Sequence, residues 1–139
     1  MITEFITKHG FQKIGSYCLD QNKSVHRRAE VLVTKRKPLV YAIFSGDTCK
    51  YIGKTVQGYS RPLGYHKNDV MKDVRDGIER ELHLGNEVTV YAKEEGLWLS
   101  YEGLTINVIE GIEQALVTTY RPEWNNFVAD RGTLVGLRA

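Results

Sequence analysis

The amino-acid sequence predicts an α/β (α+β) fold, in which a small mixed or antiparallel sheet is flanked by helices. Two kinds of pattern predict it: short segments rich in aromatic and β-branched residues, and longer segments with apolar residues at helical spacing. The length of 139 residues suits one domain. Its 42% hydrophobic and 26% charged fractions are typical of a folded globular protein.

The strand signals begin with a hairpin. Residues 39–44 (LVYAIF) are typical of a buried strand, and the turn residues 45–47 separate them from a second strand at residues 50–53. Further strands are predicted at residues 88–92, 97–101 and 104–108, the last two as a hairpin across Glu102 and Gly103.

Helical spacing predicts α-helices at residues 69–84 and 108–120. Apolar residues recur every three or four positions in both, and Pro122 forbids continuation of the second. The residues predicted to face the core are Val70, Val74, Ile78, Leu82, Ile109, Ile112, Leu116 and Val117. A further helix start is predicted at residues 60–62, because proline is favourable in a first helical turn.

The first 37 residues are predicted to be a largely irregular N-terminal extension, and residues 38–139 the main domain. Within the extension, residues 11–19 have strand character, and the basic run at residues 35–37 ends at Pro38. No internal repeat or low-complexity tract divides the chain further.

Several locations and chemistries are not expected. No apolar stretch approaches the ~20 residues needed to span a bilayer, so we expect no membrane association. The first residues have neither the basic nor the apolar region of a secretory signal, which favours a cytoplasmic protein. Cys18 and Cys49 are isolated, and we interpret them as reduced thiols.

The net charge of +2 conceals an asymmetry. Residues 1–70 contain 12 Lys/Arg and 5 Asp/Glu, a net charge of +7, whereas residues 71–139 contain 7 and 12, a net charge of −5. A clustered basic surface suits a polyanion, because each neutralised phosphate releases counterions. The alternative is a solvated basic face beside an acidic one.

Four separated pieces of the sequence carry reactive groups. Tyr41 ends the segment LVY, and Tyr51 begins the segment YIG. Arg61 follows Gly53 by eight residues, and Glu113 begins the run EQALVTTYRPEWN. Together they supply two phenols, a guanidinium and a carboxylate, the groups needed to hydrolyse a phosphodiester with one metal ion.

This combination resembles the GIY-YIG nucleases over roughly residues 38–126, and most resembles the phage endonuclease II branch. The resemblance implies a metal-dependent DNA endonuclease that hydrolyses phosphodiester bonds at a single site per chain. Leu39 stands where the family has a glycine, and Pro62 directly after the arginine is unusual. Neither difference removes a reactive group.

For the two phenols, the resemblance implies that Tyr41 is the general base or orients the attacking water, with Tyr51 beside it. Both emerge on one face if the hairpin pairs in register. Free tyrosine has a pKa near ~10, so a base at neutral pH needs a drop of about 2–3 units. A metal ion or Arg61 would supply that drop, or the phenol would pass its proton on during the reaction.

The resemblance also assigns the groups that bind phosphate. Arg61 would grip the scissile phosphate and stabilise its developing charge. Tyr65, one helical turn later, matches a position where some family members carry histidine, and His66 is then a phosphate contact or proton carrier. Lys54 is a candidate contact to the DNA backbone, with a solvated strand-end lysine as the alternative.

Glu113 is the implied metal ligand. A single carboxylate with several waters suits Mg²⁺, and Mn²⁺ is the second candidate. Glu110 lies one turn earlier and is the rival; the downstream residues of the motif lie at family distances from Glu113 instead. Asn125 is expected to hold the final loop to the site through its side chain, or else to be an ordinary turn residue.

The expected partner is DNA. The extension, whether it contacts DNA or packs on the core, supplies further candidate DNA contacts: Arg27, Arg28, Lys35, Arg36 and Lys37. One site cuts one strand, so cleavage of a duplex needs a homo-oligomer, a dimer or tetramer. The alternatives are a non-catalytic DNA-binding module on the same fold, or a nuclease of RNA or branched DNA.

Overall fold

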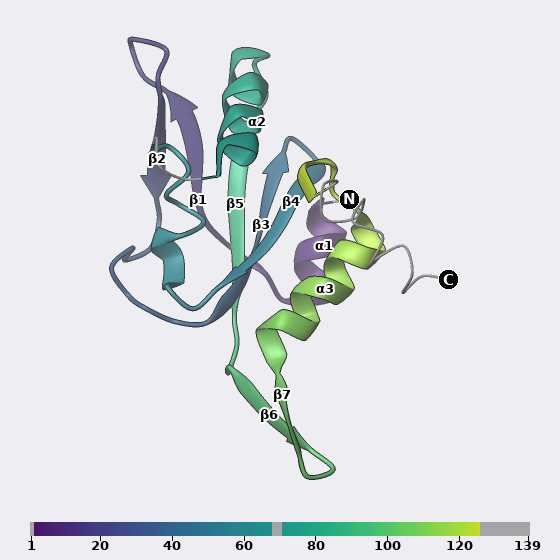
Figure 1. Cartoon of the computed structure of the whole chain (residues 1–139). Helices are drawn as coiled ribbons and strands as arrows, with labels where there is room; N and C mark the ends of the chain where they lie inside the picture. Colours follow the sequence, from purple (N-terminus) through teal and green to yellow (C-terminus); the bar gives the residue numbers. More distant parts are fainter. Residues whose placement is uncertain (1, 68–70, 126–139) are drawn as a thin grey trace.

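The computed structural model describes residues 2–67 and 71–125, which form an antiparallel sheet covered by helices on both faces (Figure 1). The sheet has five strands in the order β2-β1-β5-β3-β4, and all of its pairings are antiparallel. Its strands are β1 (Gln12–Leu19), β2 (Val25–Ala29), β3 (Leu39–Ser45), β4 (Thr48–Thr55) and β5 (Val88–Glu94). The α+β fold is therefore confirmed, with an antiparallel sheet.

Helices cover the two faces in different ways. Helices α1 (Ile2–His9) and α3 (Val108–Tyr120) supply apolar side chains to the core on one face. Helix α2 (Lys72–His83) and the irregular segment after the short 3₁₀ turn η1 (Gly58–Ser60) cover the other face.

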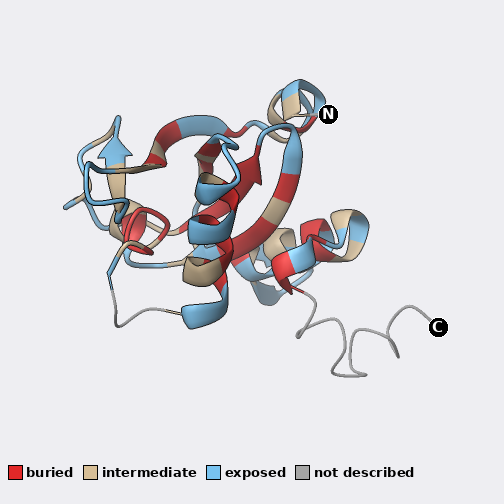
Figure 2. Ribbon diagram, turned by 90° about the horizontal axis from the view of Figure 1, so that it is seen from above, coloured by how far each residue is buried: buried red, intermediate tan, exposed pale blue. Residues whose placement is uncertain are grey.

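The central strand β3 explains why its sequence is apolar without interruption. Leu39, Tyr41 and Ile43 point into the core beneath α2, whereas Val40, Ala42 and Phe44 point into the core beneath α1 and α3. All seven residues of β3 are buried, as the colouring by burial shows (Figure 2). Successive strand residues face opposite sides of a sheet, and here both sides are covered.

Several predicted elements are confirmed. The hairpin of β3 and β4 is present, and α3 spans the predicted residues 108–120. A small separate hairpin, β6 (Trp98–Tyr101) and β7 (Leu104–Asn107), projects from the body beside α3 (Figure 1). Helix α2 matches the prediction at residues 69–84, although Asp69 and Val70 lie outside the described residues.

The helix predicted to start at residues 60–62 is wrong. Residues 58–60 form one 3₁₀ turn, and non-helical turns follow through residue 67. The carbonyl oxygen of Pro62 accepts a hydrogen bond from the side chain of Tyr17, 2.6 Å away, rather than from a helical amide. A tertiary contact therefore overrides the local preference of proline for a helix start.

The irregular structure predicted for most of residues 1–37 is also wrong, whereas the strand predicted at residues 11–19 is confirmed as β1. This segment contains α1, β1 and β2, and β1 lies inside the sheet, between β2 and β5. Strand pairing depends on partners distant in sequence, so the local sequence did not reveal that β1 lies inside the sheet. The domain boundary at residue 37 remains a prediction. Among the described residues, no helix has the length and apolar character needed to cross a membrane.

Candidate active site

Three tyrosines meet on the face of the sheet beneath α2. Tyr41 comes from β3, Tyr51 from β4, and Tyr65 from the turns after η1. Their ring centroids are 6.1 Å apart for Tyr41 and Tyr51, and 6.4 Å apart for each of the other two pairs. The hydroxyl oxygens of Tyr41 and Tyr65 are 2.7 Å apart and share a hydrogen bond.

Gly53, the glycine of YIG, makes this arrangement possible. It lies directly opposite Tyr41 in the pairing of β3 with β4. A Cβ atom at Gly53 would lie 2.5 Å from Cζ of Tyr41 and 2.6 Å from its hydroxyl oxygen. The ring of Tyr41 therefore passes across β4 at the position where only glycine leaves space for it. A glycine inside a strand often marks such a close approach.

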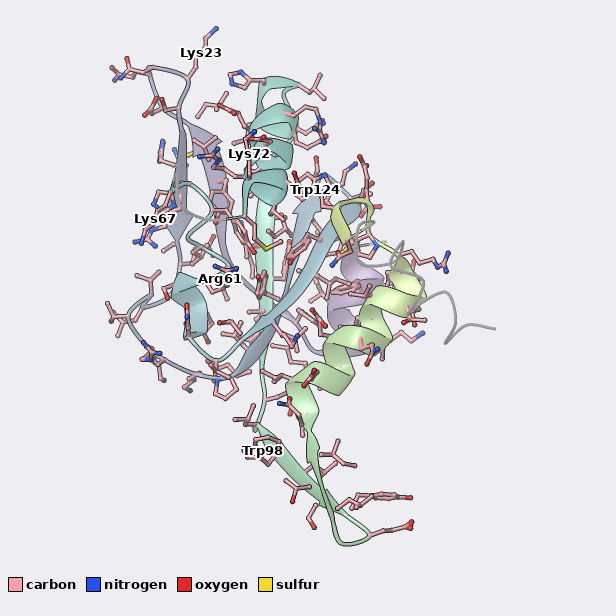
Figure 3. The ribbon with its side chains drawn as sticks, viewed as in Figure 1. Lys23, Arg61, Lys67, Lys72, Trp98 and Trp124 are labelled. Carbon is pink, nitrogen blue, oxygen red and sulfur yellow. The ribbon has the colours of Figure 1, made fainter. Side chains whose placement is uncertain are left out.

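Arg61 completes this half of the site. Its guanidinium carbon lies 5.8 Å from the ring centroid of Tyr65, within the range of a cation–π contact. Figure 3 shows Arg61 on the segment between η1 and α2, on the same side of the molecule as Lys67. Because Arg61 is only half-buried, its charge stays available to an anion.

All three phenols hold their protons tightly. Burial, followed by the neighbouring phenols Tyr65 and Tyr51, raises the pKa of Tyr41 well above its usual value of 10, and Arg61 lowers it by less. Burial likewise raises the pKa of Tyr51 and of Tyr65. The drop in pKa that a general base would need is thus not supplied by Arg61.

Glu113 lies on the other side of Tyr51, at the free edge of β4. A cavity of ≈ 190 Å³ is lined there by Tyr51, Lys54, Glu110, Glu113 and Asn125, among others. Nζ of Lys54 lies 3.8 Å from Oε1 of Glu113. The cavity brings the carboxylate and the phenol of two distant motif pieces together.

The carboxyl group of Glu113 fits a divalent cation that keeps most of its water. Burial raises the pKa of Glu113, Lys54 opposes this, and the nearby Glu110 adds to it. The positive charge of Lys54 therefore does not fully offset the cost of burying the carboxylate of Glu113. No group of three His, Cys, Asp or Glu residues that could hold a metal occurs within residues 2–67 and 71–125. One carboxylate beside a cavity with room for water ligands suits Mg²⁺, which dehydrates reluctantly.

Asn125 holds the chain where it crosses the edge of β4. In the 3₁₀ turn η2 (Glu123–Asn125), its side-chain amide donates to the carbonyl oxygen of Ile52, 2.9 Å away, and accepts from the amide nitrogen of Ile52, 3.0 Å away. The amide group thus takes the place of a neighbouring strand. Just before it, Trp124 packs against α2 at Gly77, where a Cβ atom would lie 2.5 Å from the indole ring.

The other predicted contacts lie around this centre. Lys37 pairs with Glu94, 2.8 Å away, and its neighbours Lys35 and Arg36 are exposed, as is Arg28 on β2. Arg27 instead donates to the carbonyl oxygen of Leu63, 3.2 Å away.

His66 lies next to the tyrosine cluster along the chain. Burial lowers its pKa, and the positive charges of Arg27 and Lys67 lower it further. Its Nδ1 is buried without a hydrogen-bond partner among the described residues. Burial and the two positive charges both favour the neutral imidazole.

Sequence reasoning missed Tyr17. This residue lies on β1, is 2% exposed, and makes two hydrogen bonds to the segment that carries Arg61 and Tyr65. Nothing in its local sequence distinguishes it from an ordinary core tyrosine, since its partners lie more than 40 residues away.

The fold thus combines paired tyrosines, an arginine beside them and a helix glutamate at the edge strand, the groups that the resemblance to the GIY-YIG nucleases implied. No protein-family model matches the sequence, and no curated protein matches it. Similarity to known proteins is therefore found in the structure.

Among solved structures, the chain is similar to bacteriophage T4 EndoII, solved as a mutant with alanine in place of a glutamate. The TM-score is 0.71 with 26% sequence identity, over 89% of this chain and 98% of EndoII. It is also similar to the restriction endonuclease Hpy188I in complex with product DNA, with a TM-score of 0.49 and 16% identity, over 86% and 80% of the two chains. The match to EndoII supports the relation to the phage endonuclease II branch of the GIY-YIG nucleases. The chain has a nuclease fold.

Proposed function

We propose that this protein is a metal-dependent DNA endonuclease that hydrolyses phosphodiester bonds at one site per chain, at the free edge of β4. The observation that carries the proposal is the position of Tyr51 between two sets of groups. Its ring packs against that of Tyr65, which Arg61 contacts, and it also lines the cavity that contains Glu113. A phosphate held at Tyr51 would lie within reach of both.

Cationic groups would bind the phosphate. Arg61 is charged at any working pH, and its planar guanidinium can donate two hydrogen bonds to one phosphate. Lys54, beside Glu113, is placed to contact a neighbouring phosphate of the same strand. Arg61 and Lys54 together would set the direction of the DNA backbone through the site.

The tyrosines would act as neutral phenols. The raised pKa of Tyr41 favours the role of orienting the attacking water over that of a free base. Its hydrogen bond to Tyr65 fixes its hydroxyl group, and a phenol can both donate and accept. Tyr51 is the phenol that lines the cavity next to Glu113.

Glu113 would hold the metal ion, Mg²⁺ or Mn²⁺, with water as the remaining ligands. When bound, such an ion polarises the phosphate and stabilises the negative charge on the leaving oxygen. The 3.8 Å separation of Lys54 and Glu113 is long for a strong ion pair, so the carboxylate is not committed to the lysine.

The direct test is nicking or linearisation of supercoiled plasmid by the wild-type protein with Mg²⁺. Replacement of Glu113 (Glu113→Ala) should lower the cleavage rate by at least about 100-fold, the loss typical of removing one electrostatic stabiliser. DNA binding, measured without metal by fluorescence anisotropy, should change little. Undiminished cleavage by the variant would contradict the metal assignment.

A wild-type protein that binds DNA in a salt-sensitive way but cuts none with Mg²⁺ or Mn²⁺ would contradict the proposed activity. That outcome would favour the non-catalytic DNA-binding module. Mapping the cut ends on a long defined DNA would report strand number and any sequence preference together.

A further inference from the structure

We propose that the hairpin of β1 and β2 positions the two reactive residues Arg61 and Tyr65, with Tyr17 as the positioning residue of the site. The expected effects on the cleavage rate depend on the proposed function, the hydrolysis of DNA. Its structural part, the attachment of the segment 61–65 to β1 and β2, can be tested without any activity.

Tyr17 bridges two backbone groups of this segment with one hydroxyl group. Its O–H donates to the carbonyl oxygen of Pro62, 2.6 Å away, and its oxygen accepts from the amide nitrogen of Tyr65, 3.0 Å away. Both bonds are buried, and the side chain is 2% exposed. Water therefore does not compete for them, and each bond leaves a costly unpaired group if it is removed.

Two further contacts reach the same segment. The side chain of Leu63 is fully buried, and a Cβ atom at Gly15 on β1 would lie 2.9 Å from it. Arg27 on β2 donates to the carbonyl oxygen of Leu63, 3.2 Å away. The segment between Arg61 and Tyr65 is thus held at its side chain and at three backbone groups by β1 and β2.

This attachment matters because residues 61–65 do not form a helix that would fix their conformation. Its internal hydrogen bonds are single turns, such as Gly64 N–H to the carbonyl oxygen of Arg61, 3.2 Å away. Tyr65 in turn holds the hydroxyl group of Tyr41. A shift of the segment would therefore move Arg61, Tyr65 and Tyr41 together, and a displacement of about 1 Å can lower a rate about 100-fold.

The variant Tyr17→Phe tests the proposal because it removes the hydroxyl group and keeps the ring in the core. We expect kcat for plasmid nicking to fall about 10- to 100-fold, while KM changes less than about 3-fold. The control is Tyr120→Phe, which removes a hydroxyl group in contact with His9 at 2.6 Å, in the core on the other face of the sheet. An unchanged kcat in a folded Tyr17→Phe protein would overturn the positioning role.

Hydrogen exchange supplies the readout that does not require cleavage. In Tyr17→Phe, the amide of Tyr65 should exchange at least about 10-fold faster, because it loses its buried acceptor, while amides of β3 keep their protection. Unchanged exchange at Tyr65 would overturn the attachment itself. If the wild-type protein cut no DNA, faster exchange at Tyr65 would still support the attachment, and only the proposed function would fail.

A pair of arginine variants separates attachment from charge. Arg27→Gln and Arg28→Gln each remove one positive charge from β2, and of the two, within the described residues, Arg27 alone has a hydrogen bond to the segment. We expect kcat to fall further in Arg27→Gln than in Arg28→Gln, with similar losses of DNA affinity at low salt. Equal kcat values in the two variants would assign Arg27 to the charged surface alone.

Discussion

At the scale of single residues, Glu113 shows the conflict between stability and the proposed function. Its carboxyl group is 22% exposed, and burial raises its pKa above the usual value of 4.5. At neutral pH the folded protein therefore holds a charge that its surroundings only partly compensate. Groups that bind metal or substrate commonly carry such a cost.

We predict that Glu113→Gln raises the melting temperature at pH 7 and lowers nicking at least about 100-fold. Because the folded-state pKa is raised, the wild-type protein binds the extra proton when folded and loses stability as pH rises through that pKa. The gain from the substitution should therefore shrink towards zero below pH 4.5, the usual pKa of the group.

Thermal melts across pH, with and without Mg²⁺, measure this prediction. Mg²⁺ should raise the melting temperature of the wild-type protein more than that of Glu113→Gln, because a ligand stabilises the state that binds it. Equal shifts in the two proteins would place the metal elsewhere. A gain in stability that persisted at low pH would contradict the carboxylate as its cause.

At the scale of elements, the pairing of β3 with β4 and its glycine places the phenols. The register puts Tyr41 opposite Gly53 and Tyr51 opposite Ile43, so the two tyrosines are diagonal neighbours on one face. The strand β4 is also the edge of the sheet, and its free side is where Asn125 and the Glu113 cavity lie. Sheet register and sheet edge together define the site.

We predict that Gly53→Ala destabilises the protein by about 1–3 kcal/mol, the usual cost of forcing atoms into a packed core. The added methyl group would overlap the ring of Tyr41, which is 1% exposed and has no free volume to move into. Urea unfolding measures the change. A variant as stable as wild type would show that the ring does not cross β4 at this position.

Gly111→Ala is the matched control. Gly111 lies on the exposed side of α3, and a Cβ atom there meets nothing within 4 Å. Alanine lowers the conformational entropy of the unfolded chain, so this variant should gain about 0.5–1 kcal/mol. Opposite signs for the same substitution would isolate the contact with Tyr41 from any general effect of alanine.

At the scale of the whole molecule, the β6–β7 hairpin has an exposed apolar face. Cross-strand pairing puts Leu99 opposite Ile106 and Tyr101 opposite Leu104 on one face of the hairpin. These four side chains are 39–64% exposed, and residues 96–107 contain no lysine or arginine. Two strands alone are marginally stable in water, and an apolar face without positive charge suits a second copy of this chain rather than DNA.

We predict that the wild-type protein self-associates through this face. The double variant Leu99→Glu/Leu104→Glu should shift it to monomer in sedimentation experiments. The matched double variant Ser100→Glu/Thr105→Glu, on the opposite face of the same hairpin, should keep the oligomer. A wild-type protein that stays monomeric at high concentration would contradict a second copy as the partner.

The sequence by itself determined the local elements and the list of reactive groups. Residues 39–44 and 108–120 have patterns that only a buried strand and an amphipathic helix satisfy, and the structure confirms both elements. The motif pieces named Tyr41, Tyr51, Arg61 and Glu113 as a set. Local propensity succeeded for the strand at residues 11–19 but failed at residues 60–62 and over the rest of residues 1–37, where partners distant in the chain decide the conformation.

Only the tertiary structure decided how the reactive side chains are arranged and how their surroundings shift their pKa values. The sheet order places β1 beside β5, so Tyr17 can hold a segment more than 40 residues away in sequence. The same packing removes water from Tyr41 and raises its pKa, whereas the motif alone left open whether this tyrosine is the base or orients the attacking water. Burial is a property of all the surrounding chain, and so no short stretch of sequence encodes it.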